Sequence, residues 1–381
     1  MNNYLKSYDA TITALSPIHV GSGNLLLKKE YIFDKQKNEV MVLNPAKFFD
    51  VMVKMRMEKQ FQDFMFDSTK KDLSWWLRNN GIPYDKCMRA VDYILDSGDT
   101  IMYKKGSGAF SVKGISVFSR DAYNLPYVPG SSIKGMLRTA LLNYLISIDG
   151  PRFSKIQNRI CNTNYATDYN GKPNKKFIYH ETADIENVAF NTLAKSEKPW
   201  DAVNSVMAGL RVSDSDVISN ESLTLSQKID LNLRGEELEL PLLRESLKPG
   251  TEVSFRITID TSVFPFTMED ILSALNMHNS LMNDYFYSKF KRGNNDENIV
   301  WLGGGVGMPS KTVIEALCRE KSLDVNDKIL HNVLGNKTYR MHKHYQDKNL
   351  GISPHVCKCT RYNGQLYDMG MGRFEATEID F

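Results

Sequence analysis

Residues 129–138 carry residue types that could bind a phosphate. A glycine-serine turn, Gly130-Ser131-Ser132, leads into a helix-like pattern with Lys134 and Arg138 one helical turn apart. The helix is predicted from apolar residues at three-four spacing: Ile133, Met136, Leu137, Ala140, Leu141, Tyr144, Leu145 and Ile148. A helix N-terminus exposes unpaired N–H groups and partial positive charge, so this turn could hold an anion. A capped surface helix, with Ser131 or Ser132 as N-cap, is the open alternative.

A second candidate lies near the N-terminus, where His19 precedes Gly21-Ser22-Gly23. An imidazole titrates near neutral pH, so His19 could act as a general acid or base in RNA cleavage. Such cleavage needs two complementary groups, and the sequence places no second histidine or lysine with His19. We therefore expect no catalytic residue here, and contact with phosphate or ribose, or simple packing, instead.

The third candidate is a glycine-rich loop at 302–309, which contains Gly303, Gly304, Gly305 and Gly307 and is followed by Lys311. It differs from a nucleotide-binding P-loop because Ser310, rather than glycine, precedes the lysine. Nucleotide hydrolysis is not expected, and no cofactor is predicted. Main-chain N–H groups of such a loop can still bind RNA phosphate, and Lys311 adds positive charge.

Residue types that bind zinc gather near the C-terminus, at His342, His344, His355, Cys357 and Cys359. Structural zinc sites usually have two or more residues between paired ligands, whereas these pairs are one residue apart. On a strand, such pairs face the same side, so coordination is possible, and half-buried cysteines fit equally well. We predict no metal site, with zinc as the open alternative.

Charge is uneven along the chain, although the formal net charge is only +3 over 381 residues. Residues 151–180 hold six Lys or Arg against one acid, and residues 337–361 have the same balance. Tyrosines lie within or next to both windows, a pattern that suits phosphate contact with base stacking: Tyr165, Tyr169, Tyr339, Tyr345 and Tyr362. A flexible insertion rich in Lys and Asn explains the first window equally well.

Composition narrows the class of protein. No apolar run reaches the length of a membrane span, and the polar start lacks the apolar core of a signal peptide. The five cysteines are an odd number and are mostly scattered, so we expect reduced thiols. These observations predict a cytoplasmic protein with no membrane partner and with two domains or one elaborated domain.

Strand and helix patterns follow one another without a simple repeat. Residues 7–20 alternate like a strand, residues 30–43 resemble a hairpin, and residues 44–96 are helical in pattern. Further elements are expected as strands at 109–118, 206–213 and 252–260, and as a helix at 267–289.

Residues 214–248 differ in character from their surroundings. Two strand-like arms meet near Arg234 and Gly235, which predicts a long hairpin projecting from the sheet. Residues 214–245 hold eight acids against three bases, so RNA contact here would be apolar wedging between bases rather than phosphate binding. An ordinary surface hairpin, or one packed on a partner protein, is the alternative.

The order of these motifs resembles the RAMP superfamily of CRISPR-associated proteins. The resemblance rests on residues 16–23, 128–138, 211–215 with the following hairpin, and 303–307. It spans most of the chain but leaves a helical insertion at 44–96 and a basic insertion at 151–198 outside. The length, the helical insertion and the C-terminal segment are most similar to the subunit that caps the 3′ end of the guide RNA in type III-A (Csm) complexes.

This resemblance implies an α+β protein of tandem ferredoxin-like (RRM-like) units. Residues 1–260 would form the first, with both insertions and a thumb hairpin at 214–248, and residues 261–381 the second. The implied partners are the guide crRNA, complementary target RNA and the repeated backbone subunit of the complex, with host trimming nucleases as further candidates.

The resemblance also implies a noncatalytic role in crRNA maturation and antiviral defence. The residues expected to bind RNA are His19, Gly21, Ser22, Gly23, Gly130, Ser131, Ser132, Lys134, Arg138, Arg211, Arg234, Gly303, Gly304, Gly305, Gly307 and Lys311. Two alternatives stay open. One is a RAMP-type endoribonuclease that uses His19 as acid or base, and the other is the equivalent guide-binding subunit of a type III-B complex.

Overall fold

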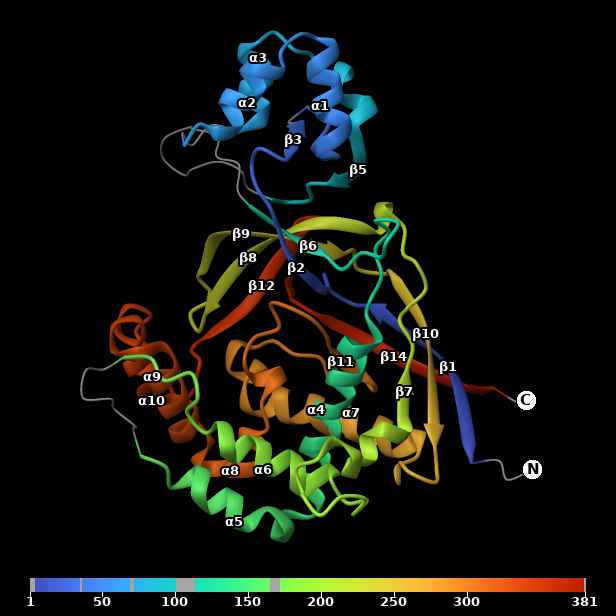
Figure 1. Ribbon diagram of the computed structural model, residues 1–381. Helices are drawn as coiled ribbons and strands as arrows, with labels where there is room; N and C mark the ends of the chain where they lie inside the picture. Colours follow the sequence, from blue (N-terminus) through green and yellow to red (C-terminus); the bar gives the residue numbers. More distant parts are fainter. Residues whose placement is uncertain (1–3, 35, 69–71, 101–113, 165–171, 380–381) are drawn as a thin grey trace.

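The computed structural model describes residues 4–34, 36–68, 72–100, 114–164 and 172–379. Two β-sheets occupy the middle of the molecule, with a small cluster of helices on one side and a larger helical layer on the other (Figure 1). The two ends of the chain lie close together, because the first and last strands are neighbours in one sheet.

The five-stranded sheet has the order β11-β14-β1-β10-β7, and all neighbouring strands are antiparallel. Ala10, Ile12 and Ala14 of the central strand are buried in alternation, as the sequence pattern predicts. The strands are β1 (Leu5–Ala14), β7 (Leu210–Val212), β10 (Glu252–Asp260), β11 (Ile299–Trp301) and β14 (Met371–Ile379).

Two helices complete this unit, α4 (Gly130–Ile148) and α7 (Met268–Tyr285), which pack against each other. Along the chain the order is β1, α4, β7, β10, α7, β14. In the sheet, β14 lies beside β1, β1 beside β10, and β10 beside β7. This is the arrangement of a ferredoxin-like unit, with the other elements inserted into it.

The predicted boundary at residue 260 does not separate two sheets. β14 pairs with β1 from Ser7 opposite Ile379 to Ala14 opposite Gly372, so the C-terminal region completes the sheet begun at the N-terminus. The α+β class is confirmed, but the described strands form one ferredoxin-like arrangement that uses both sides of residue 260. Local sequence patterns predict strands, whereas the pairing of distant strands depends on tertiary packing.

A larger, mixed sheet lies beside the first, with the order β2-β6-β9-β8-β5-β4-β3 and with β12 and β13 joined to β8. β5 pairs with β8, and β6 with β9, in parallel; the other pairs are antiparallel. The strands are β2 (Gly21–Leu26), β3 (Tyr31–Asp34), β4 (Glu39–Leu43), β5 (Val91–Asp96), β6 (Ile115–Phe118), β8 (Leu223–Asn232), β9 (Glu237–Leu247), β12 (Val356–Tyr362) and β13 (Gln365–Asp368). The predicted hairpin at 30–43 is confirmed as β3 and β4. The start of the strand expected at 109–118 lies outside the described residues.

The predicted hairpin at 214–248 is present as β8 and β9, but its arms do not project from the sheet. β12 pairs with β8 near the turn, from Val356 opposite Asn232 to Cys359 opposite Ile229. β5 and β6 flank the other ends of the two arms. The turn itself, which contains Arg234 and Gly235, remains exposed.

The helical insertion has its own small core above the sheets (Figure 1). It comprises α1 (Pro45–Lys54), α2 (Glu58–Phe66) and α3 (Leu73–Asn79), and the chain then returns through a 3₁₀ helix to β5. Phe64 stacks on Trp76, with ring centroids 5.4 Å apart. Asn44 and Asp72 cap α1 and α3 through their side chains, which explains where these helices begin.

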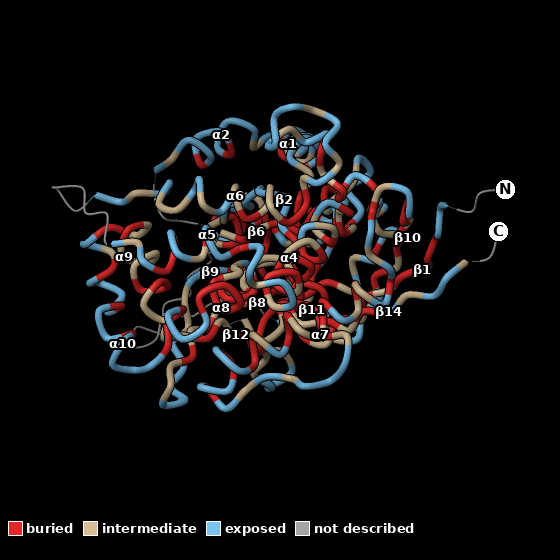
Figure 2. Tube along the Cα trace, turned by 90° about the horizontal axis from the view of Figure 1, so that it is seen from below, coloured by how far each residue is buried: buried red, intermediate tan, exposed pale blue. Residues whose placement is uncertain are grey.

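The described part of the basic insertion contains two helices. It forms α5 (Gly150–Cys161) and α6 (Tyr179–Phe190), which pack against each other and, with α8 (Ile314–Cys318), α9 (Ser322–Met341) and α10 (Asp347–Leu350), build the lower layer. Figure 2 shows buried residues in the interior and exposed ones on the outer helical faces. Tyr165 and Tyr169 lie outside the described residues. Within the described ranges, no helix is both long and apolar enough to cross a membrane.

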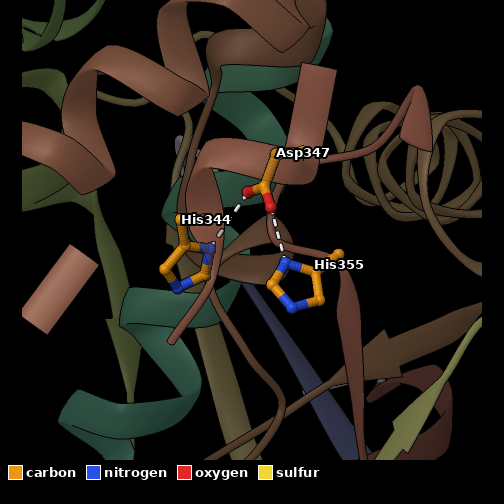
Figure 3. A group of neighbouring side chains, drawn as sticks. All are labelled: His344, Asp347 and His355. Atoms are coloured by element: carbon orange, nitrogen blue, oxygen red, sulfur yellow. Dashed lines mark hydrogen bonds and ion pairs between the residues drawn. The ribbon is translucent and has the colours of Figure 1, made fainter. Parts of the chain in front are cut away.

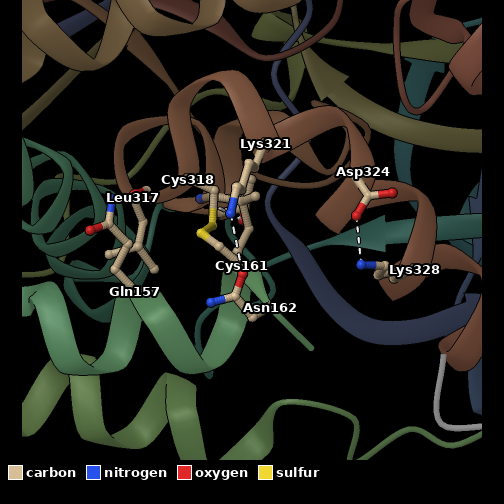
Figure 4. The surroundings of a disulfide bond; sticks show 10 residues. Gln157, Cys161, Asn162, Leu317, Cys318, Lys321, Asp324 and Lys328 are labelled. Atoms are coloured by element: carbon tan, nitrogen blue, oxygen red, sulfur yellow. Dashed lines mark hydrogen bonds and ion pairs between the residues drawn. A yellow bond between two sulfur atoms is a disulfide. The ribbon is translucent and has the colours of Figure 1, made fainter. Parts of the chain in front are cut away.

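Two cysteines correct the expectation of reduced thiols. Cys161 of α5 and Cys318 of α8 form a disulfide with their Cα atoms 5.8 Å apart (Figure 4). Beside it, the Gln157 side-chain amide donates to the carbonyl of Leu317 at 2.6 Å. The pairing was not predicted because 157 residues separate the two cysteines along the chain. Cys87, Cys357 and Cys359 are free and buried.

Candidate nucleic-acid interface

Two of the predicted motifs, far apart in sequence, are in direct contact. The N–H of Gly304 donates to the carbonyl oxygen of His19 at 2.7 Å. The end of β9 and the residue before β14 are bonded to the histidine-glycine segment as well. The N–H of Leu247 donates to the carbonyl oxygen of Ile18, and the N–H of Gly370 donates to that of Pro17. The histidine-glycine loop (residues 17–23) and the glycine-rich loop (residues 302–309) therefore pack together next to the ends of β9 and β14, which belong to different sheets.

The glycines in these loops permit this close contact. Gly303 has φ of +90°, and a Cβ there would lie 2.1 Å from the His19 carbonyl oxygen. A Cβ on Gly21 would lie 2.7 Å from Nε2 of the His19 ring. Packing against His19 thus accounts for the residue type at both positions, independently of any ligand.

His19 is a buried, neutral residue rather than an exposed acid or base. Its side chain lies under the surface, with Nδ1 2.6 Å from the carbonyl oxygen of Glu245. Because a carbonyl only accepts, Nδ1 carries the proton and Nε2 is left as an acceptor. Burial, with a smaller contribution from the Arg244 cation, lowers the pKa of His19 to about 4.

A buried carboxylate fixes the strand behind His19. The Glu245 side chain is fully buried and accepts hydrogen bonds from the Tyr93 hydroxyl at 2.8 Å and from the Phe118 N–H at 2.9 Å. Arg120 pairs with the same carboxylate at 3.3 Å and stacks on the Tyr93 ring. These bonds hold β9 against β5 and β6, and so position Arg244 next to the loops.

Cationic side chains surround the glycine-rich loop. A Cβ on Gly305 would lie 3.5 Å from Nη1 of Arg244, and this buried nitrogen makes no hydrogen bond within the described structure. Lys311 is exposed, and partial desolvation together with the Arg244 charge lowers its pKa. Another cation, Lys358, lies next to Gly307, where a Cβ would be 3.6 Å from Cγ of the lysine.

Lys358 shares a single acid with Lys228. The Nζ of Lys358 lies 2.9 Å from Asp230, and that of Lys228 lies 3.3 Å from it. Burial and the neighbouring Lys358 charge lower the pKa of Lys228. We call Arg244, Lys311, Lys228 and Lys358 the glycine-loop cation cluster. Its four positive charges face one carboxylate and would attract a polyanion.

The predicted anion cradle at the start of α4 is occupied by the protein's own groups. The N–H of Gly130 donates to Asp214 Oδ1 at 2.8 Å. The Lys134 ammonium donates to the carbonyls of Met207 and Leu210 at 2.8 and 2.7 Å. Lys134 therefore fixes α4 to the chain leading into β7, and its ammonium is bonded within the protein.

Other details of the α4 prediction are corrected too. The helix begins at Gly130 after Pro129, and neither Ser131 nor Ser132 caps it. Arg138 forms an ion pair with Glu186 of α6. Ile148, expected on the buried face, is 56% exposed because it ends the helix. Phosphate binding at this turn stays a prediction.

The remaining predicted contacts lie away from the bond between His19 and Gly304. Ser22 and Gly23 belong to the exposed strand β2. Arg211 is an exposed residue of β7, 3.9 Å from Asp260, and Arg234 is exposed at the hairpin turn. In the second basic window, Tyr339 is buried and donates to Asp327, and Lys348 pairs with Asp324. Much of that window is thus paired internally.

Three cations of the cluster were absent from the predicted site. Lys228 and Arg244 lie in the hairpin, whose overall negative charge concealed them, and Lys358 was noted only as part of a basic window. Strand alternation could have placed Lys228 and Asp230 on one face, and the register sets Arg244 opposite Ser226 on that face. The pairing of β12 with β8, which brings Lys358 opposite Asp230, has no local signal.

The zinc-type residues separate in space. His344 and His355 lie around Asp347, whereas Cys357 and Cys359 lie beside Asp368.

Comparison with known proteins identifies the family. A profile of the RAMP superfamily matches residues 11–306, which include the end of β1, α4, the β8–β9 hairpin and most of the glycine-rich loop. The chain belongs to the RAMP superfamily. The resemblance inferred from the motifs is confirmed, and in this RAMP protein two of the loops on which it rests are in contact.

Individual relatives of this RAMP protein are CRISPR components. It is 27% identical to the Csm5 protein of Mycobacterium tuberculosis strain H37Rv, with 97% of each chain covered. It is 25% identical to Csm5 of Streptococcus thermophilus, over 83% of this chain and 82% of the relative. The first of these relatives aligns with nearly the whole length of the chain.

Solved structures share its fold. A chain in the cryo-EM structure of a type III-A Csm-crRNA-target RNA ternary complex matches with a TM-score of 0.64 and 17% identity, covering 97% of this chain and 100% of that one. The crystal structure of T. onnurineus Csm5 matches with a TM-score of 0.60 and 15% identity, covering 95% and 99%. At these identities the likeness concerns the fold.

Proposed function

We propose that this RAMP protein is a noncatalytic RNA-binding subunit of a type III-A CRISPR effector complex. In this role it caps the 3′ end of the guide crRNA, supports crRNA maturation and target RNA binding, and packs on the repeated backbone subunit. The proposal is supported by likeness over nearly the full length to proteins named Csm5, and by a shared fold with a chain of a Csm-crRNA-target RNA complex.

The single observation that carries the proposal is the meeting of the two glycine loops beside the glycine-loop cation cluster. Phosphate contacts by Lys and Arg supply most sequence-independent affinity for RNA or DNA. Arg244 lies near Gly305, Lys311 interacts with the charge of Arg244, and Lys358 lies near Gly307. A phosphate chain following the loop would therefore meet cations along its path. The sequence itself would be read by base pairing of the guide rather than by the protein.

The hairpin turn is the proposed thumb. Arg234 is exposed there, and Leu238 and Leu242 of β9 are 61% and 49% exposed. An apolar side chain in such a place can wedge between bases, as intercalating residues do in duplexes. Lys228 and Asp230 lie on β8, the other arm of the hairpin. The wedge would therefore be next to the glycine-rich loop.

The noncatalytic part of the proposal rests on His19. General acid-base cleavage of RNA requires an accessible group that changes protonation near the working pH. His19 is buried, bonded to Glu245 and depressed in pKa to about 4, which favours a packing role. The endoribonuclease alternative predicts repeat-RNA cleavage by the native protein that is lost in His19→Ala.

The predicted contacts that are not next to the cation cluster are retained as secondary candidates. Gly21, Ser22 and Gly23 lie on an exposed strand, and Ser131 and Ser132 lie at the start of α4. They would extend the phosphate path away from the cation cluster.

The proposal is tested with tagged protein purified at mild salt from its native host, followed by sequencing of the bound RNA. We expect crRNAs with defined 3′ ends together with a repeated backbone subunit. In the Arg244→Ala, Lys311→Ala double variant, crRNA should be lost or its 3′ ends shifted. Arg256→Ala, an exposed arginine of β10, is the matched control and should behave like the native protein. Unchanged crRNA in the double variant contradicts the assignment of this site.

A further inference from the structure

Histidines, cysteines and acids near the C-terminus form two buried groups of ligand-type side chains. In each group, one ligand atom per residue lies within 4.8 Å of the others. The groups are His344, Asp347 and His355, and Cys357, Cys359 and Asp368. Both contain residue types that transition metals bind, so charge and protonation must decide between them.

The cysteine group is unsuited to a metal. The Arg292 guanidinium lies 2.5 Å from Asp368 Oδ1 and neutralises that carboxylate. Hydrogen bonding with Cys359, followed by burial, raises the pKa of the Cys357 thiol well above its ordinary value. Zinc binds the thiolate form, and here the thiol form is favoured next to a cation that repels a metal.

The histidine group has the opposite electrostatics. The Asp347 carboxylate is fully buried, with His344 Nδ1 3.0 Å from one oxygen and His355 Nδ1 2.5 Å from the other. Figure 3 shows the two rings on either side of the carboxylate, each with a nitrogen directed at it. Ser353 donates to the same carboxylate at 2.7 Å. Burial disfavours the charged form of Asp347, but these hydrogen bonds outweigh it and lower its pKa.

We propose that His344, Asp347 and His355 bind a divalent transition metal of the zinc type. Two imidazole nitrogens and one carboxylate oxygen form a common three-ligand zinc set, with water in the fourth position. Tetrahedral bonds of about 2.0 Å separate ligand atoms by about 3.3 Å. His344 Nδ1 and His355 Nδ1 face different oxygens of Asp347, and one ligand atom from each of the three residues lies within 4.8 Å of the others. Reaching the tetrahedral separation therefore needs a shift of at most about 1.5 Å in the rings and the carboxylate.

Metal binding would replace the two hydrogen bonds between the histidines and Asp347. Each neutral imidazole would ligate through Nδ1 and carry its single proton on Nε2, and Asp347 would stay a carboxylate. This assignment departs from the sequence-based expectation of no metal, because Asp347 lies outside the zinc-type set recognised in the sequence. It does not depend on RNA binding.

The position of the group suggests a structural role for the metal. His344 begins a 3₁₀ helix just after α9, Asp347 begins α10, and His355 directly precedes β12. β12 pairs with β8 close to the hairpin turn. A metal would therefore tie the end of α9 to the strand that supports the proposed thumb.

The test is a titration of metal-free full-length protein with Co²⁺, followed by its visible d–d absorption and by competition with Zn²⁺. We expect one Co²⁺ per chain, displaced by Zn²⁺, and loss of this binding in His355→Ala and Asp347→Ala. Cys357→Ser and His180→Ala, which changes an exposed histidine of α6, are matched controls and should bind normally. Circular dichroism checks that each variant is folded.

A gain-of-signal variant keeps the proposal testable if the alanine variants fail to fold. His355→Cys should bind Co²⁺ with a new thiolate-to-cobalt charge-transfer band. If residue 355 only donates a hydrogen bond to Asp347 and does not ligate a metal, no such band should appear. The proposal is overturned if the native protein binds neither metal, if binding survives His355→Ala, or if Cys357→Ser abolishes it.

Discussion

The carbonyl oxygen of His19 and the N–H of Gly304 form a 2.7 Å hydrogen bond that joins the two ends of the chain at the candidate RNA-binding surface. The bond places the glycine-rich loop against a buried histidine and beside Arg244. The same contact thus supports both the fold and the proposed phosphate path, and the two roles can be separated by substitution.

Gly303→Ala should destabilise the protein strongly. The new Cβ would lie 2.1 Å from a main-chain oxygen at φ of +90°, so clash adds to the left-handed backbone cost. We expect a loss of about 3 kcal/mol in the free energy of unfolding, measured by urea denaturation. Gly250→Ala is the control, because its φ of +89° is matched but no atom lies within 4 Å. It should cost about 1 kcal/mol; equal losses in both variants would refute the close-packing argument.

Glu245→Gln should be far more damaging than the loss of an exposed carboxylate. The substitution removes the charge that balances the buried Arg120, which should cost about 3 kcal/mol of unfolding free energy. Glu237→Gln, at the more exposed pair with Arg361, should cost about 1 kcal/mol or less. Chemical denaturation of both variants at neutral pH measures the difference. Similar small effects would mean that Glu245 does not anchor β9.

Acid should destabilise the fold through two buried histidines. Burial lowers the pKa of both His19 and His278 to about 4, below the unfolded value of about 6.5. Between these values the unfolded chain binds more protons, so stability falls as pH falls. Each histidine should contribute a loss of about 2 kcal/mol from pH 7.5 to pH 5.

The measurement is the urea midpoint as a function of pH. His278→Gln should be less stable than the native protein at pH 7.5 but should lose less stability on acidification. His180→Gln, at an exposed position, should follow the native pH dependence. A native-like slope in His278→Gln would argue against its buried neutral state.

Reduction of the Cys161–Cys318 disulfide should lower stability. The bond joins α5 to α8, the α-helix that follows the glycine-rich loop, and it constrains the unfolded chain. We expect a loss of about 2–4 kcal/mol on reduction or in the Cys161→Ser, Cys318→Ser double variant. Adding reductant to that double variant is the control and should change nothing. If reductant leaves the native protein unaffected, the two cysteines are not paired in solution.

Elements with a strong local pattern were predictable from the sequence. The alternation of Ala10, Ile12 and Ala14 marked β1, and residues 252–260 were predicted as a strand and form β10. The two glycine loops were recognised because their glycines occur in a motif order typical of the superfamily. Their contact was not predicted, because it depends on how β9, β14 and the loops pack in three dimensions.

Side chains that act through distant partners were not predictable. Asp214 accepts a hydrogen bond from the Gly130 N–H at the start of α4, and Lys134 donates to main-chain carbonyls; the sequence pattern of α4 shows neither bond. Arg244 joins the cation cluster only because its hairpin is held inside the sheet. Strand pairing across hundreds of residues has no local signal, and the site depends on it.

The most direct test of the central claim is ultraviolet crosslinking of the purified native assembly, with the crosslinked peptides identified by mass spectrometry. The account predicts crRNA crosslinks in residues 302–311 and in the β8–β9 hairpin, near the 3′ end of the guide. Recovery of the protein without crRNA, or with crosslinks confined to surfaces away from both segments, would contradict it.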